Sequence, residues 1–253
     1  MEVIYGPVPS WRLGRSLGVD PVCAKEKICS FDCLYCQLGK TIHKTNERKV
    51  FIDEKELEKA LNEIKGKAEL DIVTFSGSAE PTLAKNLGKL VETARMLNKP
   101  IAILTNSSTI FTKDAIEDLK KVDIVIAKLD APNQKLLEEI NQPVEGVTFE
   151  KIFNGIKNFR KEFKGKLALQ MMFIDKNKDH AEEMAELARE INPDEVQINT
   201  PLRPCKAKPL PEKELEEIKK YFKFLNVVSV YEAPKKDVKP LSGHNTLLRR
   251  GKL

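Results

Sequence analysis

The sequence lacks any run of apolar residues long enough to cross a lipid bilayer. Residues 1–7 also lack the basic segment followed by an apolar one that marks a secretory signal. Both absences argue against a membrane-inserted or exported protein. We therefore expect a soluble cytoplasmic protein with no membrane partner.

The chain has 253 residues, of which 41% are hydrophobic, so it can bury a sizeable core as one α/β domain of barrel size. We expect residues 1–205 to form the barrel and residues 206–253 to form a C-terminal extension packed on it. Charged residues make up 32% of the chain and are rich in Lys and Glu, a balance typical of many hyperthermophile proteins.

Cysteine is sparse, with five residues in the chain, but Cys29, Cys33 and Cys36 fall within eight residues. Thiols this dense in a cytoplasmic protein usually hold a metal or carry out redox chemistry. A tetrahedral zinc site needs a fourth ligand, and the sequence has no second Cys or His pair at zinc-finger or zinc-ribbon spacing. An iron–sulfur cluster held by three thiolates leaves one iron open. The alternative is a loop of three buried structural cysteines.

The C-x3-C-x2-C spacing, with Tyr35 directly before the last cysteine, resembles the cluster loop of the radical S-adenosylmethionine (SAM) superfamily. The resemblance implies that Cys29, Cys33 and Cys36 bind a 4Fe-4S cluster, that the open iron chelates SAM, and that Tyr35 packs beside the adenine. The opening segment, residues 6–20, resembles a subgroup of uncharacterised iron–sulfur oxidoreductases related to the enzyme that builds the wybutosine base in tRNA. That enzyme's additional amino-terminal cysteines are absent, and Cys23 and Cys205 are too few to hold a second cluster unaided.

Short apolar runs alternate with helical patterns along most of the chain. Strands are predicted near 15–22 and at 70–75, 100–105, 122–128, 167–174, 195–199 and 226–231, and helices at 54–65, 85–97, 113–120, 149–163, 181–191 and 211–222. Repeated β-α units predict a parallel sheet with right-handed crossovers. The fold class is therefore α/β, and six such units fit the partial (β/α)6 TIM-like barrel that the resemblance implies, with the Gly- and Pro-rich opening segment as a short irregular N-terminal cover.

The residues after the second strand are the next informative segment. Residues 76–79 are all small, so the backbone there can approach a ligand closely. Glu80 and Pro81 follow, and the proline prevents the strand from continuing. The segment resembles the superfamily's Gly-Gly-Glu-Pro motif, which binds the amino group of SAM, with Ser78 and Ala79 in place of two glycines. The resemblance makes Gly77, Ser78 and Glu80 candidate SAM-binding residues. The alternative is a simple strand-to-helix turn.

Polar residues also follow the other strands, at the sheet edge where α/β folds bind ligands. In the superfamily, groups at these places bind the ribose and carboxylate of SAM. The candidates are Asn106, Lys128, Asp130, Gln170 and Asn199. Any one of them can instead be a cap or turn former.

The net charge of +5 comes entirely from residues 233–253, which carry six basic residues and one acidic residue. Lys235, Lys236, Lys239, Arg249 and Arg250 are therefore candidates for contacts with RNA phosphates, although a solvated, partly mobile tail is an equal alternative. Two further expectations concern single residues. Arg12 and Arg15 lie among glycines where they can face an anionic ligand, and His244 is either a substrate-side acid or base or an exposed tail residue.

The resemblance predicts an enzyme that cleaves SAM at a reduced 4Fe-4S cluster. The resulting 5'-deoxyadenosyl radical would abstract hydrogen from an unknown substrate, possibly tRNA, with ferredoxin or flavodoxin as electron donor. One alternative is an activase or maturase that acts on a protein partner. Another is a zinc- or nucleic-acid-binding module without catalysis, which would leave the polar strand ends unexplained.

Overall fold

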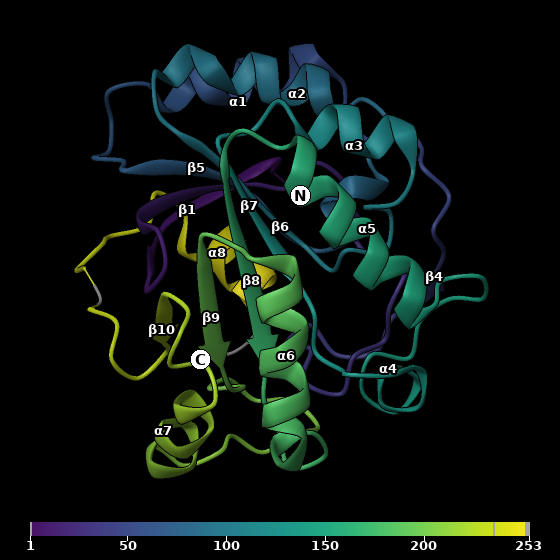
Figure 1. Ribbon diagram of the computed structural model, residues 1–253. Coiled ribbons are helices and arrows are strands. Elements are labelled where there is room, and N and C mark those ends of the chain that lie inside the picture. The colour runs from purple at the N-terminus through teal and green to yellow at the C-terminus, as the bar shows by residue number, and fades with distance from the viewer. Residues whose placement is uncertain (1, 235, 251–253) are drawn as a thin grey trace.

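The computed structural model describes residues 2–234 and 236–250, without the side chain of Arg250. Its centre is an eight-stranded sheet that curls into a half-barrel with helices on its outer side (Figure 1). The strand order is β1 (Ile4–Ser10), β2 (Gly14–Val19), β5 (Ile72–Phe75), β6 (Ile101–Thr105), β7 (Ile124–Lys128), β8 (Lys166–Met172), β9 (Glu195–Asn199) and β10 (Val227–Ser229). All neighbours are parallel except β1 and β2. The prediction of a partial TIM-like α/β barrel is confirmed.

Six of the α-helices in the described part of the chain lie where they were predicted, and α4 and α8 were not predicted. The helices are α1 (Glu54–Ile64), α2 (Leu87–Ala94), α3 (Lys113–Leu119), α4 (Gln134–Ile140), α5 (Phe149–Glu162), α6 (Ala181–Ile191), α7 (Glu212–Lys220) and α8 (Gly243–Arg250). The Asp53 side chain accepts a hydrogen bond from the backbone N–H of Glu56 at 2.8 Å, which fixes the start of α1. Leu57 and Leu61 on the same helix are fully buried. None of the described helices is both long and apolar enough to span a membrane.

The strands between these helices are buried on both faces. All four residues of β5 are buried, as are residues 167–172 of β8. Such burial explains why the strands appear in the sequence as short apolar runs rather than as alternating patterns. Because these strands are parallel, the polar residues that follow them gather at one edge of the sheet.

The opening segment differs from its prediction, because it forms a β-hairpin rather than an irregular cover. β1 pairs antiparallel with β2, with a register irregularity between Tyr5 and Val8. Pro7 is tolerated because β1 is the edge strand of the sheet and its pairing with β2 is interrupted between Tyr5 and Val8, so no ladder hydrogen bond needs the N–H that proline lacks. Gly18 is required on β2, because the Tyr5 ring occupies the space that a Cβ would fill.

Two more elements depart from the predictions. The α4 helix was not predicted; it is only seven residues long, and Asn133 caps it by accepting from the N–H of Leu136. The basic tail folds back as α8, which packs against β1, and the backbone N–H of Leu241 donates to the carbonyl of Gly6 at 2.7 Å. Residues 236–250 of the tail are therefore part of the folded structure.

Candidate functional site

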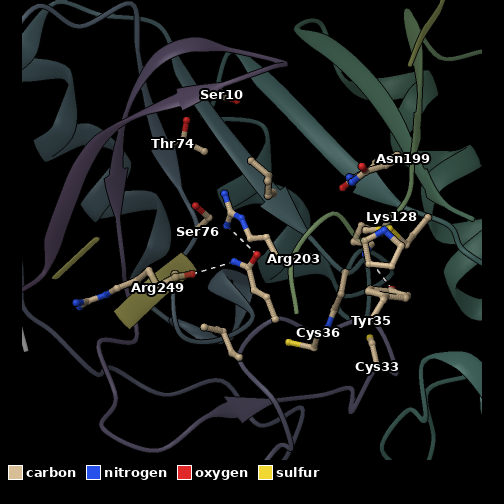
Figure 2. Close-up of a pocket in the computed structure, with 18 of the residues that line it drawn as sticks. Ser10, Cys33, Tyr35, Cys36, Thr74, Ser76, Lys128, Asn199, Arg203 and Arg249 are labelled. Atoms are coloured by element: carbon tan, nitrogen blue, oxygen red, sulfur yellow. Dashed lines mark hydrogen bonds between the residues drawn. The ribbon is translucent and has the colours of Figure 1, made fainter. Parts of the chain in front are cut away.

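A cavity of about 580 Å³ occupies the inside of the curled sheet. The three clustered cysteines line it together with residues at the ends of β5, β6, β7, β8 and β9. Figure 2 shows Cys33 and Cys36 at one end of the cavity and Ser10 and Thr74 at the other. A single cavity thus joins the cysteine loop to the interior of the half-barrel.

The cysteine loop is held in place by the end of α4. The backbone N–H groups of Asp32 and Leu34 each donate to carbonyls at residues 140–141, at 2.9 Å. Cys29, Cys33 and Cys36 are free thiols that face the cavity. Burial raises the pKa of Cys29 to about 12 and also raises the pKa of Cys33. A bound metal would favour the thiolate form of each.

The donor set fits an iron–sulfur cluster better than a single metal ion. Within the described residues, no three Cys, His, Asp or Glu side chains converge tightly enough to hold one ion. The three thiols instead share one cavity, and the loop brings no fourth side-chain ligand to them. Lys27 also lines the cavity; burial lowers its pKa, but the negative charge of Cys36 and then of Cys29 outweighs burial and raises it. The Lys27 ammonium therefore lies beside the three thiols.

Two asparagine side chains donate to the cysteine sulfurs. Nδ2 of Asn106 lies 3.6 Å from Sγ of Cys29, and Nδ2 of Asn141 lies 3.4 Å from Sγ of Cys33. Asn106 was predicted as a SAM ligand. Asn141 was not predicted, since it lies at the end of the short α4 helix and 108 residues from Cys33. Hydrogen bonds to cysteine sulfur are one means by which proteins set the reduction potential of a cluster.

Tyr35 is fixed by a buried polar network. Its hydroxyl donates to Asp130 and accepts from Nζ of Lys128 at 2.8 Å and from Nδ2 of Asn141 at 2.7 Å. The Lys128 ammonium also lies 4.0 Å from the centre of the Tyr35 ring. Burial, and then the charge of Asp130, raise the pKa of Tyr35 well above its usual value. The ring is thus a rigid, neutral wall of the cavity.

Glu80 joins the ends of two neighbouring strands. Its carboxylate accepts hydrogen bonds from the N–H and hydroxyl of Thr82, the hydroxyl of Thr105 and the N–H of Asn106. Burial raises its pKa, and these hydrogen bonds oppose the rise. Oε2 accepts only from Asn106 at 2.7 Å among the described residues, which leaves lone-pair capacity on the cavity side.

Gly77 and Ser78 have different surroundings from those expected. Gly77 lines the cavity, but a Cβ there would overlap the carboxyl of Asp20, so the glycine is required by Asp20 as well as by any ligand. Ser78 donates to the same carboxylate through its N–H at 3.0 Å and its hydroxyl at 2.8 Å. Its side chain therefore faces Asp20 and does not line the cavity.

The structure brings most of the predicted site residues together. Cys29, Cys33, Cys36, Tyr35, Gly77, Glu80, Asn106, Lys128, Gln170 and Asn199 all line the one cavity. Asp130 does not; it lies behind Tyr35 and accepts from the N–H of Met172 at 2.8 Å. Sequence reasoning missed Lys27, Gln37, Asn141 and Arg203. The nearness of Lys27 to Cys29 was a usable signal, whereas Asn141 and Arg203 come close only through the fold.

Arg203 and Gln37 connect the cavity to the C-terminal helix. The Arg203 guanidinium donates to Oε1 of Gln37 at 2.7 Å, and Nε2 of Gln37 donates to the carbonyl of Arg249 at 3.1 Å (Figure 2). Cys23, Cys205 and His244 do not line the cavity, and His244 is exposed on α8.

The basic tail offers fewer free cations than its sequence indicates. Arg249, expected to meet phosphates, is 2% exposed and paired with Asp20. Lys236 forms an ion pair with Asp71 at 2.9 Å, while Lys239 is exposed. The predicted phosphate contacts of Lys235 and of the Arg250 side chain lie outside the described residues. The expectation for Arg249 is wrong, because its guanidinium neutralises a buried carboxylate instead.

Comparison with known proteins agrees with this site. Residues 27–188 match the family model of the radical SAM superfamily. A UPF0026 protein of Methanocaldococcus jannaschii is 39% identical over 234 residues, which cover 90% of this chain and 72% of the relative. The chain therefore belongs to the radical SAM superfamily and, within it, to the UPF0026 proteins. It is an enzyme of the radical SAM class, and membership implies a 4Fe-4S cluster and SAM.

Solved structures show the same fold at low sequence identity. Streptococcus suis SuiB bound to S-adenosylmethionine is 19% identical with a TM-score of 0.63, over 81% of this chain and 48% of that one. TYW1 with a lysine-pyruvate adduct bound is 18% identical with a TM-score of 0.64, and the match covers 84% of this chain and 74% of that one. The expected kinship with the wybutosine enzyme is thus present only as a distant structural match.

Proposed function

We propose that this protein binds a 4Fe-4S cluster through Cys29, Cys33 and Cys36 and binds SAM beside it, in the cavity of the half-barrel. When bound, the reduced cluster supplies one electron to SAM, which yields methionine and a 5'-deoxyadenosyl radical that abstracts hydrogen from the substrate. One observation supports this proposal most directly: the three thiols and the Glu80 turn open into the same cavity.

The protein's own residues have distinct tasks in this proposal. Glu80 accepts a hydrogen bond from the SAM ammonium, Lys128 faces the SAM carboxylate, and the fixed Tyr35 ring lies against the adenine. Gln170 and Asn199 border the same space and offer polar groups to the ribose, and Gly77 lines it beside Glu80. Because the cavity lies inside the sheet, it also keeps water away from a reactive intermediate.

Residues around the cysteine loop compensate the negative charge of the proposed thiolate ligands. Lys27 stabilises the thiolates electrostatically, and Asn106 and Asn141 donate to two of the sulfurs. One electron must come from outside, and we propose a cytoplasmic ferredoxin or flavodoxin as the donor. The substrate stays unassigned here: tRNA was the sequence-based candidate, but burial of Arg249 removes part of its support.

Iron and sulfide analysis tests the cluster. Anaerobically reconstituted protein is expected to hold about four irons and a similar amount of sulfide per chain. Cys29→Ala, Cys33→Ala and Cys36→Ala each lose the cluster. Cys205→Ala is the matched control and keeps it, because Cys205 lies off the cavity and bonds to the carbonyl of Ala207. Tightly bound zinc without sulfide would contradict the proposal.

A further inference from the structure

A segment on the surface lies directly against the cysteine loop. Residues 39–45 follow Cys36, and the N–H of Gly39 donates to the carbonyl of Cys36 at 3.0 Å. The N–H of Thr45 donates to the carbonyl of Cys29 at 3.0 Å. A small parallel sheet also joins the segment to the loop, and its strands are β3 (Ile28–Cys29) and β4 (His43–Lys44). The segment is therefore bonded through its backbone to two of the proposed cluster ligands.

Three lysines around this segment are exposed and have no partner. Lys40 and Lys44 lie on the segment, and Lys25 lies just before β3. Among the described residues, none of the three side chains forms an ion pair or a hydrogen bond. The Lys27 side chain is only 8% exposed, and its ammonium donates to the carbonyl of Gly39 at 2.8 Å. It adds a fourth positive charge beneath the segment.

Positive charge exceeds negative charge at this surface. Residues 25–45 contain four lysines and two acidic residues, whereas residues 1–232 as a whole have no net charge. Both acidic residues are already hydrogen-bonded, since Asp32 accepts a backbone N–H at 2.7 Å and Glu26 is bonded to a histidine at 2.6 Å. Glu145, on a segment that bonds to the cysteine loop, is exposed and unpaired among the described residues, so it offsets one lysine.

An exposed apolar side chain lies among these lysines. Ile42 falls between Lys40 and Lys44 in the sequence and is 56% exposed. Its N–H donates to the carbonyl of Lys27 at 3.1 Å, so its backbone is fixed while its side chain faces solvent. An apolar residue with charged neighbours suits a transient contact with another protein. Lys25, Lys40, Ile42 and Lys44 are called the lysine surface below.

The lysine surface lies outside the cavity but close to the proposed cluster ligands. None of its four residues lines the cavity, so they do not contact a ligand held inside it. Lys44, however, is the strand partner of Cys29. An electron can cross a protein wall without contact between donor and acceptor, whereas an RNA or protein substrate must bring its reacting atom into the cavity. The position therefore favours delivery of an electron over binding of a substrate.

We propose that a small acidic electron-carrier protein binds the lysine surface and delivers its electron through the wall behind it. In that step the carrier is oxidised by one electron and the cluster is reduced by the same electron, and no bond forms or breaks. The inference rests on the proposed function, because it requires a cluster at Cys29, Cys33 and Cys36. Electron-transfer complexes are small and weak, and opposite charge raises their rate of association.

Two variants of equal net charge test this site. The test variant reverses the three charges of the lysine surface: Lys25→Glu, Lys40→Glu and Lys44→Glu. The matched control reverses three other exposed lysines, which have no ion pair among the described residues and precede β5, β6 and β8 at the amino ends of the strands: Lys67→Glu, Lys99→Glu and Lys164→Glu. All proteins carry their reconstituted cluster, and the probes are an acidic ferredoxin and an acidic flavodoxin.

Binding is measured first, with each probe oxidised so that no turnover occurs. Calorimetry at low salt should show that at least one probe binds the wild type and the control alike, and binds the test variant about tenfold or more weakly. Rapid mixing with the reduced probe then follows the bleaching of the cluster's visible absorbance. The rate should fall for the test variant, and the wild-type rate should fall as salt rises. Reduction by dithionite, which needs no protein contact, should change little.

Equal binding and equal reduction rates in the two variants overturn the inference, as does a wild-type rate that does not depend on salt. Failure of both probes to reduce a wild-type cluster that dithionite reduces also overturns it. If the test variant loses affinity for tRNA while its reduction by the probes is unchanged, the surface serves RNA and the inference is wrong.

A further variant covers the case in which charge reversal prevents assembly of the cluster. It neutralises the same three positions, and it should show a smaller loss in the same direction: Lys25→Gln, Lys40→Gln and Lys44→Gln. The salt dependence of the wild type needs no variant at all. The proposed function fails separately, if wild-type protein holds no cluster or if dithionite does not reduce it.

Discussion

Arg249 and Asp20 form an ion pair inside the protein, with Nε of Arg249 3.1 Å from Oδ2 of Asp20 and both side chains almost completely buried. The same carboxylate accepts both hydrogen bonds of Ser78. The C-terminal helix is thus joined through one buried charge to the turn that carries Gly77 and Glu80. Helix α8 therefore supports the wall of the cavity.

Arg249→Met is therefore expected to destabilise the protein strongly. Removing one partner of a buried pair leaves the other charge uncompensated, which costs about 3–5 kcal/mol of unfolding free energy. Arg95→Met is the control, because Arg95 pairs with Asp123 at the surface and such pairs contribute about 0–1 kcal/mol. Denaturant titration of both variants measures the difference. Equal small losses would show that the Asp20 pair is not formed.

Glu80→Gln and Ser78→Ala test separately the side of the turn that lines the cavity, where Glu80 lies, and the side that contacts Asp20, where Ser78 lies. The glutamine keeps the size of Glu80 and can still accept from Thr82, but it loses the charge, so SAM affinity should fall about tenfold or more. Ser78→Ala removes a hydrogen bond to Asp20 and should leave SAM affinity unchanged, at a cost of about 1 kcal/mol in stability. Calorimetry with SAM on reconstituted protein checks both. A loss of affinity confined to the Ser78 variant would reverse our assignment.

Arg12→Met is expected to stabilise the ligand-free protein. Nε and Nη1 of Arg12 are buried and have no hydrogen-bond partner among the described residues. Leaving a buried donor unsatisfied costs about 1–3 kcal/mol, and methionine removes both that cost and the repulsion with Arg203. A gain of about 1 kcal/mol corresponds to a rise of about 2–4 °C in melting temperature for a chain of this length. Arg15→Met, which breaks the pairing with Asp71, should show no such rise. A lower melting temperature for Arg12→Met would assign Arg12 a structural role.

The sequence was informative where the signal is local. The spacing of Cys29, Cys33 and Cys36 lies within one loop, and doubly buried strands are continuous apolar runs, so both the cysteine site and the alternation of strands and helices could be predicted. The β1–β2 hairpin could not, because Pro7 and the glycines around it usually mark irregular segments and are tolerated only on an edge strand.

The missed features depend on contacts between distant residues. Whether Arg249 is free or buried is decided by Asp20, 229 positions away. Asn141 reaches Cys33 only because a short helix packs behind the loop, and Ser78 turns from the cavity only because Asp20 lies behind it. Motif matching placed Gly77, Ser78 and Glu80 in one segment, but it could not say which way each side chain points.

Formation of 5'-deoxyadenosine tests the central claim most directly. Reconstituted wild-type protein, reduced with dithionite under anaerobic conditions and given SAM, is predicted to release 5'-deoxyadenosine and methionine. Cys205→Ala should release both at the wild-type rate, and Cys36→Ala should release neither. Wild-type protein that holds its cluster and binds SAM but releases no 5'-deoxyadenosine, or equal release by Cys36→Ala, would contradict the account.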